Sequence, residues 1–152
     1  MTFRYRSHQI AEIIKAVKVV REGQTLEFRK YGERGRALLL ELDLTAGMVP
    51  DLRLSVKAGR FDDPTTYTAA LILADQRVRG IDYSATSRAR FYKVRIPQGW
   101  HENLIDPNLA THDPQRNRHE ALAPFDVTDL RVFLHEVCRR WHIELAIEEA
   151  LL

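Results

Sequence analysis

Apolar residues near the N-terminus recur at the spacing of a helix. They follow Ser7, a residue type that often caps helices, and they stop before Gly23, a residue type that often ends them. A first helix is therefore expected from Ser7 to Gly23 at the latest, with Lys18 on its solvent side. The apolar positions of this helix are Ile10, Ile13, Ile14 and Val17.

Alternation of apolar and polar residues then predicts a series of strands. The clearest period of two runs from Leu52 to Val56, where apolar side chains alternate with Arg53 and Ser55. The connections look too short for crossover helices, so an antiparallel sheet is expected. The predicted strands are residues 25–31, 36–45, 52–57, 67–78 and 88–96, the last two joined through residues 80–87.

A broad apolar stripe between residues 127 and 141 predicts a second helix, capped by Asp126 with Asp129 three residues later. Residues 142–147 extend this helix or form a short last strand. The pattern predicts a single α+β domain over residues 1–152, an antiparallel β-sheet with an N-terminal helix and a C-terminal helix packed on one face. A chain of 152 residues suits one domain.

Composition narrows the class of protein further. The chain is 45% hydrophobic and 29% charged, which is ordinary for a globular domain. Its single cysteine, Cys138, excludes an internal disulfide and a cysteine-rich zinc site, and its helical spacing predicts a buried position. No segment reads as a signal peptide, and the apolar runs are too short to span a bilayer. A cytoplasmic protein with no membrane contact and no cofactor is expected.

Charge is unevenly distributed along the chain. Residues 77–97 hold six basic residues and one acid, whereas residues 101–152 hold five basic and ten acidic residues. A polarised molecule can steer a polyanion to one face. An ordinary solvated surface explains the same distribution, and both interpretations stay open.

A long loop is expected over residues 99–124, and it concentrates polar and aromatic side chains that are typical of a site. Cleavage of RNA without a metal needs a base, an acid and a cation for the phosphate. His101 and His119 suit the proton transfers, because the pKa of histidine lies near neutrality. Arginine suits the phosphate, because its fork of donors is always charged. The alternative is that both histidines form hydrogen bonds to backbone turns.

Other interpretations of the same region also stay open. The ligand-capable residues His101, Glu102, Asp106, His112, Asp113 and His119 could converge on a metal, although their order matches no familiar metal motif. Trp100 could stack a base or anchor a protein partner, and it could equally close the end of a sheet. Basic strands with interleaved aromatic residues suit single-stranded nucleic acid, but arginines on an edge strand also prevent strand pairing.

The order of parts in residues 71–143 resembles the TumE-type proteins of bacterial toxin–antitoxin modules and related small bacterial families. In those proteins, a strand with arginine and aspartate precedes a histidine-rich loop and a closing helix. The matching pieces are Arg79-Gly80-Ile81-Asp82-Tyr83, Trp100-His101-Glu102-Asn103, Asn117-Arg118-His119 and the helix from Asp126. The resemblance implies a toxin–antitoxin or phage-defence protein that acts on RNA and has a cognate antitoxin as its partner.

Two hypotheses about function follow. In the first, the protein is a metal-independent ribonuclease or binds another phosphate-bearing ligand. Its catalytic residues are His101, His119 and Asp82, and its phosphate-binding residues are Arg77, Arg79 and Arg118. In the second, it is a non-enzymatic module that binds a protein partner or a second copy of itself. The interaction residues are then Trp100, Tyr83 and Asn103. The sequence leaves the oligomeric state open.

Overall fold

The computed structural model describes residues 5–32, 35–47, 49–86, 88–90, 94–109, 112–122 and 125–145. Over these ranges the chain forms a mostly antiparallel sheet with a helix near each end, which confirms the predicted α+β class. The helices are α1 (Ser7–Lys15) and α2 (Leu130–Arg140). Neither described helix is long and apolar enough to cross a membrane.

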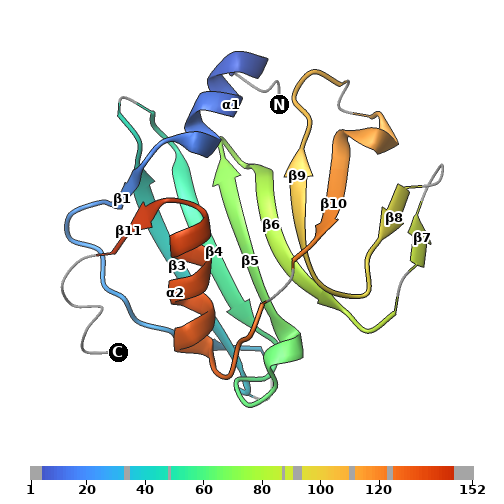
Figure 1. The fold of residues 1–152 in the computed structure, drawn as a ribbon. Coiled ribbons are helices and arrows are strands. Elements are labelled where there is room, and N and C mark those ends of the chain that lie inside the picture. Colours follow the sequence, from blue (N-terminus) through green and yellow to red (C-terminus); the bar gives the residue numbers. More distant parts are fainter. Residues whose placement is uncertain are drawn as a thin grey trace.

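Nine strands form the large sheet, in the order β10-β9-β6-β5-β4-β3-β1-β11, with β2 paired to β3 (Figure 1). They are β1 (Lys18–Val20), β2 (Arg29–Tyr31), β3 (Ala37–Thr45), β4 (Leu52–Ala58), β5 (Tyr67–Leu73), β6 (Gln76–Ser84), β9 (Gly99–Ile105), β10 (Asn117–Ala121) and β11 (Ile143–Glu144). Described neighbours are antiparallel except β1 and β11, which are parallel. A separate hairpin joins β7 (Arg88–Arg90) to β8 (Val94–Ile96).

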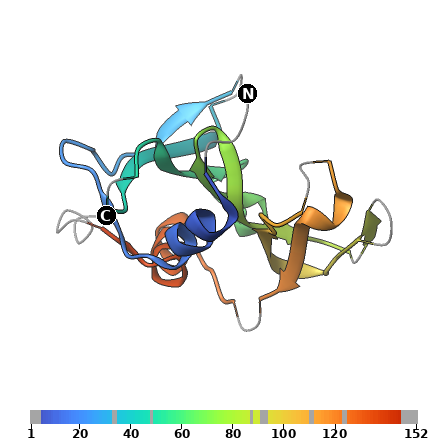
Figure 2. The same cartoon turned by 90° about the horizontal axis from the view of Figure 1, so that it is seen from above.

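Alternating apolar residues of β3, β4 and β5 build the core. Leu42, Leu54 and Leu71 follow one another across these three strands in register, and all three are buried. Phe133 of α2 packs against Tyr67 of β5, with ring centroids 5.6 Å apart. Seen from above, α2 lies beside the curved sheet (Figure 2). Phe133 and the other buried residues of α2 belong to the same core cluster as the buried side chains of the central strands.

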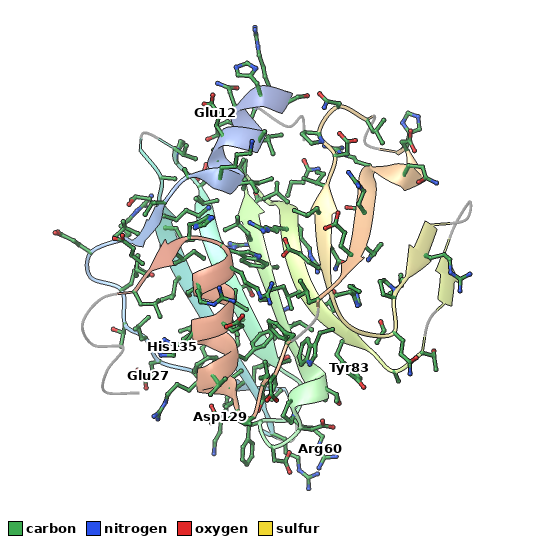
Figure 3. The ribbon with its side chains drawn as sticks, viewed as in Figure 1. Glu12, Glu27, Arg60, Tyr83, Asp129 and His135 are labelled. Carbon is green, nitrogen blue, oxygen red and sulfur yellow. The ribbon has the colours of Figure 1, made fainter. Side chains whose placement is uncertain are left out.

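Both helix starts differ from the predicted caps. The N-cap of α1 is Arg6, whose backbone N–H donates to the side chain of Gln9 at 2.8 Å, so the prediction of Ser7 as the cap is wrong. Asp129, not Asp126, caps α2: it lies at the start of the helix (Figure 3) and accepts from the N–H of Val132 at 2.9 Å. A cap is fixed by where the backbone turns, which residue type alone leaves open.

The first helix is also shorter than predicted. It ends at Lys15, and Lys18 lies in β1, where it is fully buried instead of facing solvent. The Nζ atom of Lys18 donates to the carbonyl oxygens of Ile14 at 3.0 Å, Ala16 at 2.8 Å and Trp141 at 2.9 Å. These carbonyls belong to the last turn of α1 and the end of α2, where helices lack backbone partners. Burial, and secondarily the charge of Arg79, lowers the pKa of Lys18 to about 8.

Residues 67–78 form most of a hairpin and not the single predicted strand. β5 and β6 are joined by a tight turn at Ala74 and Asp75, both of which have positive φ. Two consecutive residues with positive φ match the twist of a two-residue hairpin, for which Asn-Gly and Asp-Gly are the usual sequences. The turn here reads Ala-Asp and contains no glycine, so the sequence did not reveal it. Most of the predicted connection 80–87 is therefore part of β6.

Candidate functional site

The predicted loop over residues 99–124 contains a β-hairpin, so that prediction is wrong. β9 and β10 pair in register, with His119 opposite Asn103 and Ala121 opposite His101. β9 also pairs with β6, where Asp82 lies opposite His101. The period of two in β9 was hidden because many of its side chains on both faces are polar. The strands thus bring three distant parts of the sequence side by side.

Side chains of β6 and β9 alternate between two faces of the sheet. Trp100 packs against Phe133 of α2, with ring centroids 5.5 Å apart, so its face is here called the α2 face. Glu102 shares this face, because it stands two residues further along β9. His101 and Asn103 point to the opposite side, here called the far face. The candidate residues are divided between these two faces.

On the far face, Asp82 contacts two neighbouring side chains at once. Its Oδ2 accepts a hydrogen bond from Nδ2 of Asn103 at 2.7 Å and forms an ion pair with Nη2 of Arg77 at 3.0 Å. The guanidinium of Arg77 crosses the backbone of Gly80 to reach this carboxylate. A β-carbon at position 80 would lie 1.9 Å from Nη2 of Arg77, so the crossing requires glycine. Asp82 thus orients both Arg77 and Asn103.

The two predicted catalytic histidines are neighbours on the far face. Their ring centroids lie 5.6 Å apart, with an angle of 57° between the ring planes. His101 is only 3% exposed, and its Nδ1 lies 3.3 Å from the carbonyl oxygen of Gly99. Because that carbonyl only accepts, the contact is a hydrogen bond in the tautomer that carries the proton on Nδ1. His119 is half-buried and lines a pocket, whereas His101 does not.

Arg79 lies on the α2 face with Glu102, although it lines the same pocket as Arg77. Its Nε donates to Oε2 of Glu102 in an ion pair whose side chains are 15% and 7% exposed, respectively. Its guanidinium also lies over the ring of Trp141, 5.6 Å from the centroid. These contacts fix Arg79 inside the fold. Glu102, which the sequence offered only as a metal ligand, serves in the structure as the counter-ion of this arginine.

The predicted interaction residues Trp100 and Tyr83 belong to an aromatic cluster on the α2 face. Ring centroids of Trp100 lie 5.5 Å from Tyr83, 5.0 Å from Phe125 and 5.5 Å from Phe133. Such distances are those of packed aromatic pairs in protein cores. Trp100 therefore closes this end of the sheet against α2, which was the alternative interpretation of the residue.

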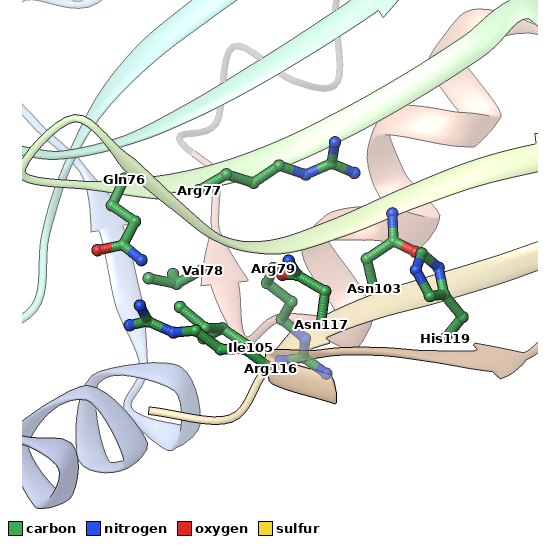
Figure 4. Close-up of a pocket in the computed structure, with 9 residues that line it drawn as sticks. All are labelled: Gln76, Arg77, Val78, Arg79, Asn103, Ile105, Arg116, Asn117 and His119. Atoms are coloured by element: carbon green, nitrogen blue, oxygen red, sulfur yellow. The ribbon is translucent and has the colours of Figure 1, made fainter. Parts of the chain in front are cut away.

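A pocket of about 320 Å³ opens where β6, β9 and β10 meet (Figure 4). Three of the lining residues are arginines, and no carboxylate is among them in the described chain. In Figure 4, Arg77 extends toward Asn103 and His119, while the guanidinium of Arg116 lies at the opposite, Gln76 end. The lining residues are Gln76, Arg77, Val78, Arg79, Asn103, Ile105, Arg116, Asn117 and His119.

Arg118, a predicted phosphate ligand, does not line this pocket. Its side chain is 66% exposed and lies 3.7 Å from Glu120 in a surface ion pair. Arg116 lines the pocket in its place and is only 6% exposed. Nothing in the sequence around Pro114 distinguished Arg116 from Arg118. In the structure Arg116 ends a short 3-10 turn, whereas Arg118 lies in β10.

Metal binding and comparison with known proteins add little to this geometry. Among the described residues, no group of three or more His, Cys, Asp or Glu is placed to hold a metal ion. No protein-family model matches the chain, and no match was found among the curated proteins or the solved structures. The resemblance to the TumE-type proteins therefore stays a prediction.

Proposed function

We propose that the protein binds a phosphate-bearing ligand, RNA in the first instance, in the pocket between β6, β9 and β10. The observation that carries this proposal is the lining itself: three arginines and a histidine without a carboxylate in the part of the chain described. Guanidinium groups suit phosphate oxygens because they donate two parallel charged hydrogen bonds. Pockets of this size, about 300 Å³ or more, are typical of small-ligand sites.

The polar groups beside the arginines suit a ribonucleotide. Nδ2 of Asn103 donates to Asp82, so its Oδ1 faces elsewhere, and this buried oxygen has no hydrogen-bond partner among the described residues. A hydroxyl of a bound ribose would satisfy this oxygen. Asn103 is thus assigned to the ligand, in place of the protein partner that the sequence offered for it.

The chemistry proposed for the site is metal-independent cleavage of RNA. His119 lines the pocket and would contact the ligand, whereas His101 lies behind it with its ring 5.6 Å from that of His119. His119 is therefore the proposed acid–base residue. His101 is proposed to act through His119, by holding that ring in place, and Asp82 by orienting Arg77.

The proposed setting is a cytoplasmic toxin–antitoxin or phage-defence system, which rests on the sequence resemblance alone. The proposed fold has both helices packed on one face of the sheet. The alternative, an interaction module that uses Trp100 and Tyr83, has less support, since both rings pack into the aromatic cluster.

The test is binding of a fluorescent single-stranded oligoribonucleotide, followed by anisotropy at several salt concentrations. Arg77→Gln should weaken binding about tenfold or more, since hydrogen bonds to charged groups contribute about 1.5–3 kcal/mol. Arg29→Gln is the matched control, because Arg29 also forms an exposed-strand ion pair, with Glu41 at 2.9 Å. No binding by the wild type, or equal losses in both variants, would contradict the proposal.

Cleavage is tested separately on the same RNA, with products resolved on a gel. His119→Ala should abolish cleavage and leave the melting temperature nearly unchanged. His101→Gln should reduce the rate and shift its pH profile, as expected for a residue that acts through His119. If the wild type binds this RNA but does not cleave it, the binding proposal stands and the nuclease proposal is contradicted.

A further inference from the structure

Arg116 differs from the other two arginines of the pocket in having no anionic partner. Arg77 pairs with Asp82, and Arg79 pairs with Glu102. Within the described chain Arg116 forms no ion pair, and its buried Nε has no hydrogen-bond partner, although the residue is only 6% exposed. Buried charges are normally paired, because leaving water is costly for an isolated ion. An unpaired buried guanidinium beside a pocket indicates an anion that arrives with the ligand.

The turn that carries Arg116 is held by several hydrogen bonds. The side chain of Asp113 accepts from the N–H of Gln115 at 2.8 Å, and its carbonyl accepts from the N–H of Arg116 at 3.0 Å. The carbonyl of Arg116 in turn accepts from the N–H of Asp106 at 2.6 Å. The backbone of this arginine is therefore fixed before a ligand binds, which limits the entropy lost on binding.

We infer that the Arg116 end of the pocket accepts a terminal phosphate monoester, so that the protein distinguishes phosphorylated from hydroxyl ends. This inference rests on the proposed function and names the ligand class of the same site. An internal phosphodiester is flanked by nucleosides on both sides and carries one charge. A terminal monoester is flanked on one side only and carries a charge of about −1.5 to −2 near neutral pH. A buried arginine at one end of a pocket of about 320 Å³ suits the second group.

The two ends of the pocket then have different roles. Arg116 and the nearby amide of Gln76 hold the terminal phosphate at one end. Arg77, Asn103 and His119 lie toward the other end, where the following nucleotide and its phosphodiester extend. The monoester can belong to an RNA end or to a free mononucleotide, because both present the same dianion to Arg116.

The experiment compares one short oligoribonucleotide in three forms, with a 5′-phosphate, a 3′-phosphate or hydroxyls at both ends. Adenosine 5′-monophosphate is added as a competitor. Wild type should bind one phosphorylated form about tenfold or more tightly than the hydroxyl form, as expected of charged hydrogen bonds to a dianion. Displacement by the mononucleotide at similar concentration would identify the free monoester as the ligand, and weak displacement would identify the RNA end.

Arg116→Met should reduce the ratio of affinities for phosphorylated and hydroxyl RNA to about one. Arg116→Lys should retain part of this preference, since lysine keeps the charge but lacks the planar, two-pronged guanidinium. Arg118→Met is the control, because Arg118 stands two residues away and is 66% exposed; its preference should match wild type. Melting temperatures of all variants establish that they fold. Equal binding of all three RNA forms by the wild type would overturn this inference and leave the proposed function standing. Absence of binding to every form would overturn both.

Discussion

The guanidinium of Arg77 crosses the backbone of Gly80 so closely that a β-carbon there would lie 1.9 Å from its Nη2 atom. This crossing lets Arg77 reach Asp82, which stands five residues further along the chain. One small residue in β6 therefore sets the position of a charged side chain in the proposed binding pocket. The relationship can be tested without touching any residue that would contact the ligand.

Gly80→Ala should weaken RNA binding to about the level of Arg77→Gln, because the new methyl group displaces the guanidinium. The fold should persist, since the displaced atoms are the far end of a flexible side chain and Gly80 has no positive φ. Affinity by anisotropy and the melting temperature are the two measurements. If Gly80→Ala binds RNA as wild type does while Arg77→Gln does not, the crossing has no role in the site.

Glu102→Ala should lower the free energy of unfolding by about 3–5 kcal/mol, because it leaves the charge of Arg79 buried without its partner. Replacing both residues, as in Arg79→Met with Glu102→Leu, should restore most of this loss, since a well-packed apolar pair avoids the desolvation penalty. Urea unfolding measures both. Glu41→Ala, which removes an exposed ion pair with Arg29, should cost about 1 kcal/mol or less. Equal losses of unfolding free energy in Glu41→Ala and Glu102→Ala would contradict a stabilising role for the buried Arg79–Glu102 pair.

Trp100→Ala should lower the free energy of unfolding by about 2–3 kcal/mol, because it removes a half-buried ring from a packed aromatic cluster. Trp100→Phe should cost much less, because it retains contact with Phe133 on α2. Phe61→Ala is the control, since that ring is 58% exposed and its removal should change stability little. If Trp100→Ala has the same free energy of unfolding as wild type, Trp100 does not stabilise the fold. The hypothesis that Trp100 binds a protein partner would then gain support.

Stability should rise between about pH 8 and pH 10, and Lys18 is the reason. Burial first, and the charge of Arg79 second, lower the pKa of Lys18 to about 8, against 10.5 as its ordinary value. Above pH 8 the folded protein has lost this proton while the unfolded chain still binds it, so raising the pH favours folding. Tyr67, whose pKa burial raises, acts in the opposite direction above pH 10.

The measurement is the free energy of unfolding of wild type at several pH values from 7 to 10, compared with that of Lys18→Met. The rise should be absent from the Lys18→Met variant and present in Lys15→Met, which removes an exposed lysine of α1. A parallel pH dependence in wild type and Lys18→Met would show that another group causes it.

Local pattern predicted the parts of the fold where apolar residues recur at the regular spacing of a strand or a helix. The β4 strand is an example, because its apolar and polar residues match the two faces of a sheet, and the stripe of α2 matches one face of a helix. Pattern failed where both faces carry polar groups, as in β9, and at the glycine-free turn of Ala74 and Asp75. A period can be read only when one face differs chemically from the other.

The sequence by itself determined the α+β class, the two helices, the antiparallel pairing and a concentration of histidine and arginine in residues 77–119. Tertiary structure alone decided which of these residues meet. It placed Arg116 in the pocket and Arg118 on the surface, turned Arg79 toward Glu102, and buried Lys18 between two helix ends. Register between strands and the direction of a turn depend on packing across the whole sheet, which no local stretch of sequence contains.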